Sequence, residues 1–375
     1  MFFIKPRIVK IILVALVILG GLAGGLYYLT HYYDPVRVVY KRMKAPSPYV
    51  FEEIEPHFLR TNPADLIPIQ TAADAEKIRK LAIGVIWGTA KVPSRLPDAV
   101  DSDIEDAHFA DMENLERIDR LRLKMTYDVP NVSYHFIPKK KSGHLVIVHQ
   151  GYAGTFHDLK HVIAAYLGQG HAVIALNLLG YGENRIGYDA FFPRFGWYEV
   201  HTHKILFLDP FAMRFFYTPV IAAINHAKEN YDYTVIDMMG FSAGGWETMI
   251  ASAVDPRIRR SYPVAGSYPL YLRNHDEPGQ SVPPQYYVPL LNAMNYLEAF
   301  VLGSWGEDRG QLQIFNRFDR CCFRNVKGLH YAPAVKAAVS KIGPGRFEVV
   351  LDETHADHKV SDFAIEIIIK DMARP

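Results

Sequence analysis

TVIDMMGFSAGGWETMIASAV, residues 234–254, is the stretch that most clearly indicates the fold of this chain. It opens with a short, nearly continuous apolar run, which is typical of a strand buried on both faces of a sheet. It closes with a helix candidate, and between the two stands Gly240-Phe241-Ser242-Ala243-Gly244. The glycines of this pentapeptide permit a tight turn. The stretch therefore predicts a strand, a sharp turn that carries Ser242, and a helix.

Runs of the same texture lie on both sides of this stretch. The strand-like runs are 144–151, 171–180, 260–266, 312–318 and 347–352, and the helix candidates are 158–170, 210–231, 330–343 and 361–372. Two alternating segments before them, 117–127 and 132–138, have a turn signal between them and predict a hairpin. Apolar strands that alternate with helices predict a mostly parallel sheet with helices on both faces. The expected fold class is therefore α/β, with a mixed sheet.

The turn at Ser242 has the features of a nucleophile position. A strained turn between a strand and a helix projects its hydroxyl above the sheet edge, next to the positive end of the helix. The pentapeptide fits G-x-S-x-G in this setting, and from about residue 116 to residue 375 the sequence resembles the α/β-hydrolase superfamily. The resemblance implies an α/β-hydrolase fold and a serine hydrolase that needs no cofactor. It also implies the chain order nucleophile, acid, histidine.

This order predicts that the acid and the histidine lie in two loops that follow Ser242 in the chain. Asp319 follows the strand-like run 312–318 and resembles the acid of the superfamily. His355 and His358 both follow the last strand-like run. His358 is preferred because it lies nearer the final helix, and His355 stays as the alternative. The resemblance implies that the imidazole accepts the proton of Ser242, that Asp319 orients the imidazole, and that an acyl-enzyme forms.

An oxyanion in such an enzyme needs two N–H donors. The resemblance implies that one is the backbone of Ala243. The other is expected from the loop after 144–151, where HQGYAG resembles the His-Gly oxyanion loop and Gln150 stands in place of the usual histidine. We expect the N–H of Tyr152 to be this donor. The glycines of this loop fit neither common phosphate-binding motif, and we expect no metal at the histidine-containing loop.

Residues 11–29 form an uncharged apolar run that is long enough to cross a membrane. Lys5, Arg7 and Lys10 precede it, which predicts a cytoplasmic N-terminus and a catalytic body on the non-cytoplasmic side. Basic residues also follow the run, from Arg37 onward. A cleaved signal peptide is the alternative, with the glycines between 20 and 25 as the cleavage region. An uncleaved single-pass anchor is favoured because the apolar run continues beyond those glycines.

The sequence divides into three parts. Residues 1–30 are expected to form a tail and a transmembrane helix, and 31–115 a linker of little regular structure with one helix at 71–87 and a surface segment at 92–115. Residues 116–375 are expected to form the catalytic domain. It contains two aromatic-rich insertions, 185–218 and 267–310. Insertions of this kind can form an apolar lid, which favours a small-molecule or lipid-like ester with an acyl or aryl group.

Composition excludes one class of partner. The chain has 41 Lys and Arg against 40 Asp and Glu, for a net charge of +1, so nothing favours nucleic acid. The two cysteines, Cys321 and Cys322, are adjacent, and neighbouring cysteines seldom bridge each other. We expect two partly buried thiols. Oligomeric state is not predicted.

Three functions are compatible with these features. The first is a membrane-anchored serine hydrolase of carboxylic esters or related acyl bonds. The second is an acyltransferase on the same residues, in which another acceptor replaces water. The third is a non-catalytic membrane-tethered binding protein on a hydrolase scaffold, which would have no need of the ordered Ser242, Asp319 and His358.

Overall fold

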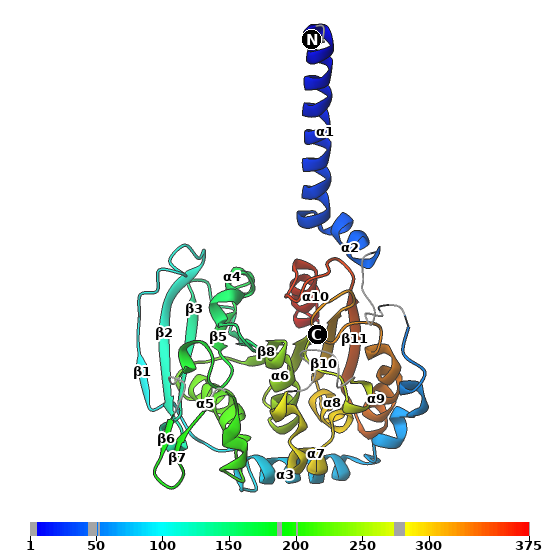
Figure 1. Cartoon of the computed structure of the whole chain (residues 1–375). Coiled ribbons are helices and arrows are strands. Elements are labelled where there is room, and N and C mark those ends of the chain that lie inside the picture. Colours follow the sequence, from blue (N-terminus) through cyan, green and yellow to red (C-terminus); the bar gives the residue numbers. More distant parts are fainter. Residues whose placement is uncertain are drawn as a thin grey trace.

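The computed structural model describes residues 6–43, 51, 53–185, 190–199, 202–273 and 282–374. A long helix, α1 (Pro6–Tyr32), stands away from a body built around one large sheet (Figure 1). Its residues Ile12–Tyr32 are apolar and form a helix long enough to cross a membrane. The most apolar part of this stretch is not buried against the body. A helix of this kind near the N-terminus is compatible with an anchor or a signal sequence.

The large sheet has nine strands in the order β1-β2-β3-β5-β4-β8-β9-β10-β11. These strands are β1 (Ala99–Asp101), β2 (Leu115–Lys124), β3 (Pro130–Pro138), β4 (His144–His149), β5 (Ala172–Leu176), β8 (Val235–Phe241), β9 (Arg260–Val264), β10 (Gly310–Asn316) and β11 (Arg346–Asp352). The pairs among β1, β2, β3 and β5 are antiparallel, and all pairs from β5 to β11 are parallel. The predicted mixed, mostly parallel sheet is confirmed.

Strand order decides where a site can form. The strand β4 lies between β5 and β8, so the chain adds strands outward on both sides of β4. In open α/β sheets, ligands bind in the crevice beyond the carboxyl ends of the strands at such a switch point. That edge carries the loop after β4 and the turn after β8.

Helices cover both faces of the sheet (Figure 1). On one face the core includes α3 (Ala72–Trp87), α5 (Arg214–Asn230), α6 (Ala243–Val254), α8 (Tyr296–Ser304) and α9 (Gly328–Ile342). On the other face it includes α4 (Lys160–Gly168) and α10 (Asp362–Met372). Alternate residues of β4 pack into the two cores. Leu145 and Ile147 lie in the first core, and Val146 and Val148 lie in the second. This double burial explains why the parallel strands are apolar throughout.

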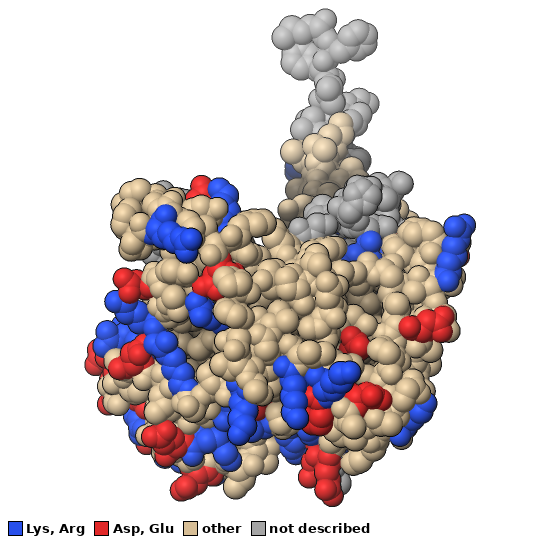
Figure 2. All heavy atoms as spheres, turned by 90° about the horizontal axis from the view of Figure 1, so that it is seen from below, with Lys and Arg blue, Asp and Glu red and all other residues tan. Residues whose placement is uncertain are grey.

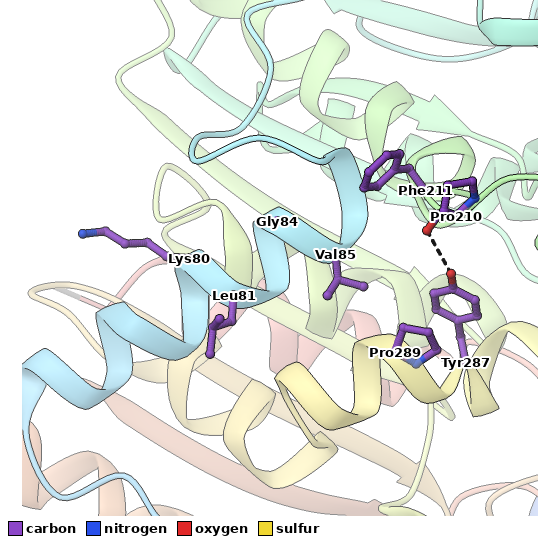
Figure 3. Close-up of a pocket in the computed structure, with 8 residues that line it drawn as sticks. All are labelled: Lys80, Leu81, Gly84, Val85, Pro210, Phe211, Tyr287 and Pro289. Atoms are coloured by element: carbon purple, nitrogen blue, oxygen red, sulfur yellow. Dashed lines mark hydrogen bonds between the residues drawn. The ribbon is translucent and has the colours of Figure 1, made fainter.

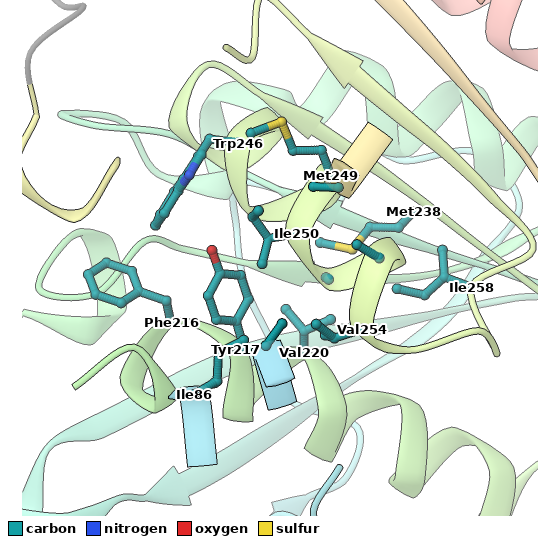
Figure 4. Close-up of a cluster of buried hydrophobic side chains, with 14 of the residues drawn as sticks. Ile86, Phe216, Tyr217, Val220, Met238, Trp246, Met249, Ile250, Val254 and Ile258 are labelled. Carbon is teal, nitrogen blue, oxygen red and sulfur yellow. The ribbon is translucent and has the colours of Figure 1, made fainter. Parts of the chain in front are cut away.

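Figure 4 shows the centre of the first core. Side chains from α3, α5, β8 and α6 meet there, and Trp246 of α6 stacks edge-on against Phe216 of α5 at a ring distance of 5.7 Å. This packing fixes α6, the helix that follows the predicted turn. The position of Ser242 is therefore set by a rigid element and not by a free loop.

The remaining elements are short. They are α2 (Asp34–Met43), α7 (Val288–Ala293), the two-stranded sheet of β6 (Ala190–Phe192) and β7 (Gly196–Tyr198), and the 3₁₀ helices η1 (Phe58–Arg60), η2 (Pro63–Leu66), η3 (Thr126–Asp128), η4 (Phe156–Leu159), η5 (Gly182–Asn184), η6 (Lys204–Phe207), η7 (Leu270–Leu272) and η8 (Pro283–Tyr286). Parts of both predicted insertions, 186–189, 200–201 and 274–281, lie outside the described residues.

The N-terminal extension differs in part from the prediction. The expected helix 71–87 is present as α3, with Thr71 in a capping box. The prediction of little regular structure between the membrane run and that helix was wrong, because α2, η1 and η2 form there. The segment 92–115 was also expected to be surface, yet it contributes β1 and the fully buried Phe109. Docking on the body stabilises these pieces, and local sequence patterns do not report such contacts.

Charges of both signs are interspersed on the face seen from below in Figure 2, and neither sign gathers into one patch there. This distribution agrees with the near-neutral composition of 41 basic and 40 acidic residues. A nucleic-acid surface would instead need a concentrated basic stripe.

Candidate active site

Ser242 occupies a strained turn at the carboxyl end of β8. Its backbone has φ 56° and ψ −123°, in a region that residues with a Cβ rarely adopt. Its N–H donates to the carbonyl oxygen of Val264 on β9 at 2.9 Å, and its carbonyl accepts from Gly245 at 2.9 Å at the start of α6. These two hydrogen bonds, to β9 and to α6, hold the strained backbone conformation of Ser242 in place.

The glycines around this turn are required by close approaches. A Cβ on Gly240 would lie 2.1 Å from the carbonyl oxygen of Gly244, and a Cβ on Gly244 would lie 2.1 Å from the carbonyl oxygen of His149. Both distances are far below contact distance, so no larger residue fits without backbone movement. These close approaches explain why glycine stands two positions before and two positions after Ser242.

Asp319 and His358 meet at the same edge of the sheet. His358 Nδ1 lies 2.5 Å from Asp319 Oδ2, and the Asp319 side chain is fully buried. Asp319 Oδ1 accepts from the backbone N–H of Cys321 at 2.7 Å and of Cys322 at 3.3 Å. A carboxylate only accepts, so Nδ1 of His358 carries the proton and Nε2 is left for another partner. This is the arrangement that a catalytic base needs.

His358 also lies close to the turn. Its ring centroid is 4.6 Å from that of Phe241, the residue directly before Ser242. The structure therefore places the Asp319–His358 pair beside the residue that precedes Ser242, with the imidazole partly open to solvent at 20% side-chain exposure.

His355 has different surroundings. It is fully buried, its Nε2 lies 3.2 Å from Asp352 Oδ2, and its Nδ1 accepts from the N–H of Asp357 at 3.2 Å. Both ring nitrogens are therefore engaged inside the loop between β11 and α10. Asp352 Oδ2 also accepts from the hydroxyl of Ser361, the N-cap of α10. His355 stabilises the loop that carries His358.

The loop after β4 approaches Ser242 closely. A Cβ on Gly151 would lie 2.8 Å from Ser242 Cβ and 2.9 Å from the backbone nitrogen of Ala243. Tyr152 follows, and its hydroxyl lies 3.0 Å from Nδ1 of the buried His203. Neither the N–H of Ala243 nor that of Tyr152 donates to another of the described residues. An oxyanion hole needs N–H donors that are not already engaged in this way.

A buried pair that the sequence did not reveal supports this loop. His149 ends β4 and Glu247 lies on α6, and their Nε2 and Oε2 atoms are 2.7 Å apart with both side chains buried. Nδ1 of His149 lies 2.9 Å from the carbonyl oxygen of Gln150, so it carries a proton. Burial raises the pKa of Glu247, against the opposing effect of His149. The contact joins the loop after β4 to α6, the helix that follows Ser242.

A sequence signal for this pair existed in retrospect. Glu247 is the one acidic residue in the apolar helix α6, and His149 directly follows the apolar run 145–148. Each residue alone is ambiguous, and only the pairing of β4 with β8 brings them together.

Cys321 and Cys322 form a disulfide with each other, so the expectation of two thiols was wrong. The bridge lies directly after Asp319, where both cysteine N–H groups donate to the carboxylate. Among the described residues, the two sulfur atoms and a ring nitrogen of His358 are the one group of three metal-ligating atoms within 4.8 Å of one another. Because the sulfur atoms are bonded to each other, they are not thiolate ligands.

The two insertions meet beside α3. A pocket of about 540 Å³ lies there, and the hydroxyl of Tyr287 donates to the carbonyl oxygen of Pro210 at 3.0 Å across it (Figure 3). It is lined by Lys80, Leu81, Gly84, Val85, Pro210, Phe211, Tyr287 and Pro289. None of the predicted catalytic residues is among them, so this pocket is separate from the candidate site.

The solved structures that resemble the chain include two esterases. Acetyl xylan esterase from Paenibacillus sp. R4 is 16% identical and has a TM-score of 0.52, over 84% of this chain and 99% of that one. Methylesterase BT1017 is 15% identical and has a TM-score of 0.58, over 87% of this chain and 69% of that one. No protein-family model and no curated protein matches the sequence. The strand order, the turn at Ser242 and these structural likenesses together show that the chain has the α/β-hydrolase fold.

Proposed function

We propose that this protein is a membrane-anchored serine hydrolase that cleaves a carboxylic ester or a related acyl bond. The observation that carries the proposal is the 2.5 Å hydrogen bond between His358 Nδ1 and Asp319 Oδ2, beside the strained turn of Ser242. The names of the two similar structures, an acetyl xylan esterase and a methylesterase, favour the ester class.

The reaction follows from the atoms available. Ser242 Oγ transfers its proton to His358 Nε2 and attacks the acyl carbon, while Asp319 stabilises the imidazolium. The N–H groups of Ala243 and Tyr152 stabilise the tetrahedral oxyanion, an effect worth about 10²–10³ in rate for one donor. His358 then returns its proton to the leaving alcohol. Water enters by the reverse route and releases the acid from the acyl-enzyme.

The proposal assigns the base to His358 and a structural role to His355. Of the two, His358 is hydrogen-bonded to Asp319, and His355 is bonded to Asp352 in the closed interior of the loop. An imidazole with both nitrogens occupied and no exposed surface is poorly suited to exchange protons with a substrate.

We further propose a role for each part of the chain in this function. Helix α1 serves as a single-pass anchor, with the catalytic body on the non-cytoplasmic side. Residues 31–115 connect the anchor to a catalytic domain that begins near residue 116 and carries the insertions 185–218 and 267–310. The anchor is supported by the apolar stretch within Ile12–Tyr32, which is not buried against the body.

Labelling with a fluorophosphonate tests the proposal most directly, because this probe reacts with activated serines. The full chain in detergent is compared with Ser242→Ala, His358→Ala and a matched control, Ser340→Ala, on the exposed face of α9. We expect labelling and ester hydrolysis in the wild type and in the control, and neither in the first two variants. A folded wild type that takes no label and cleaves no ester of a broad panel would favour the non-catalytic binding protein.

A further inference from the structure

The helix that follows the membrane run has an amphipathic character. Helix α2 packs against the end of α1, and its sequence DPVRVVYKRM mixes basic residues with valines, a tyrosine and a methionine. Val39 and Met43 are 54% and 83% exposed. Exposed apolar side chains on a basic amphipathic helix next to a membrane span indicate a helix that lies in the headgroup region.

The same helix is bonded to the loop that carries the candidate base. Arg37 of α2 forms an ion pair with Asp357, and these side chains are only 16% and 31% exposed. Asp357 directly precedes His358, and its N–H donates to the buried His355. Consecutive Cα atoms are about 3.8 Å apart. His358 thus lies one residue away from a group that is fixed to the interfacial helix.

The chain between α2 and α3 contacts the loop of the candidate acid as well. Phe51 packs against Phe318 at a ring distance of 5.8 Å and against Ala356, and all three are nearly fully buried. Arg317 Nε donates to the carbonyl oxygen of Phe51 at 3.1 Å. Phe318 directly precedes Asp319. The polypeptide that arrives from the anchor therefore lies against both loops that carry the charged members of the site.

Figure 1 shows α2 between the base of α1 and the part of the body where α10 and β11 lie. From these contacts we propose that α2 and Phe51 hold the loops of Asp319 and His358 against the surface of the bilayer. The substrate is then an acyl ester of an amphiphile taken from the membrane. This inference rests on the proposed serine hydrolase.

The chemistry explains why such placement matters. Each methylene that leaves the bilayer for water adds a hydrophobic cost, so a long-chain ester reaches a distant site rarely. An active site at the surface of the bilayer shortens that transfer. The reaction itself is unchanged: the bond from acyl carbon to alkoxy oxygen breaks, a bond to Ser242 Oγ forms, the alcohol leaves with the proton from His358, and water then releases the fatty acid.

The test uses the full chain in phosphatidylcholine vesicles and two reporter esters with the same leaving group. p-Nitrophenyl acetate is presented in water, and p-nitrophenyl hexadecanoate is dissolved in the bilayer. Arg37→Glu places two like charges at the contact with Asp357. Lys80→Glu, on the exposed side of α3, makes the same charge change elsewhere. The exchange variant Arg37→Glu with Asp357→Arg restores opposite charges.

We expect Arg37→Glu to slow hydrolysis of the bilayer ester by about fivefold or more, as loss of a partly buried ion pair allows. Hydrolysis of the acetate stays unchanged, Lys80→Glu behaves as the wild type, and the exchange variant recovers part of the loss. Equal losses on both esters in Arg37→Glu, no loss on either ester, or a wild type that cleaves the acetate but not the bilayer ester would each overturn the inference. In those cases fluorophosphonate labelling of Ser242 still supports the hydrolase, whereas absent labelling and absent acetate cleavage mean that the proposed function itself has failed.

Discussion

His358 Nδ1 and Asp319 Oδ2 lie 2.5 Å apart, although 39 positions separate the two residues in the chain. The contact joins the loop after β10 to the loop after β11, two strands that pair in parallel over their whole length. Because the carboxyl ends of paired parallel strands meet at one edge, the register of β10 and β11 brings the proposed acid and the proposed base together.

Asp319→Asn tests this contact. The amide can donate to Nδ1 of His358 and stabilise the wrong tautomer, so we expect kcat to fall by about 10³–10⁴-fold with little change in KM. Steady-state kinetics on a soluble ester measures the loss. Asp232→Asn, an exposed change after α5, is the control and keeps wild-type kinetics. A loss below tenfold in Asp319→Asn would remove the carboxylate from the mechanism.

The two histidines of the last loop are expected to separate activity from stability. His358→Ala abolishes fluorophosphonate labelling and leaves the melting temperature near that of the wild type, because its side chain is partly exposed. His355→Ala removes two buried hydrogen bonds, and the free energy of unfolding falls by about 1–3 kcal/mol. Its folded fraction still reacts with the label. Thermal unfolding and labelling of the same samples measure both effects, and the reverse pattern would make His355 the base.

Much of this site could be predicted from sequence because its parts are local. The turn at Ser242 is set by glycines within two positions of it, and chain order points to Asp319. The choice between His355 and His358 depends on which carboxylate each one faces, Asp352 or Asp319, and that is a tertiary contact.

Other features could not be predicted from the sequence because they also depend on tertiary contacts. The pair of His149 and Glu247 exists only through strand pairing, and α2 is stabilised by its contact with α1 and by the ion pair of Arg37. The bridge between Cys321 and Cys322 depends on a backbone turn after Asp319 that spacing alone does not report. Each of these features involves parts of the chain that local patterns describe separately.

Stability at acid pH is expected to depend on Asp352. Its burial raises the pKa, but hydrogen bonds from His355, Ser361 and Thr354 outweigh burial and lower the pKa to about 2. Since the folded pKa lies below the unfolded one, the carboxylate stabilises the fold above about pH 4 and this contribution disappears as the pH falls toward 2. The shift corresponds to about 2–3 kcal/mol.

Urea unfolding of the wild type and Asp352→Asn across pH 7 to 3 measures this dependence. The difference in unfolding free energy between the two should be largest at pH 7 and shrink as the solution is acidified. Glu113→Gln, an exposed change before β2, controls for the loss of one carboxylate. A difference that stays constant with pH would show that the carboxylate charge contributes nothing to the loop.

Gly151→Ala is expected to damage catalysis selectively. The added Cβ would lie 2.8 Å from Ser242 Cβ and 2.9 Å from the nitrogen of Ala243, so the loop after β4 must move away from the serine. That movement displaces the N–H of Tyr152 from the oxyanion, and loss of one such donor lowers kcat by about 10²–10³-fold. Gly168→Ala, where a Cβ meets nothing within 4 Å at the end of α4, is the matched control. Because the proposed role concerns the transition state, KM should change little in Gly151→Ala while kcat falls; an unchanged kcat would exclude this loop from the oxyanion hole.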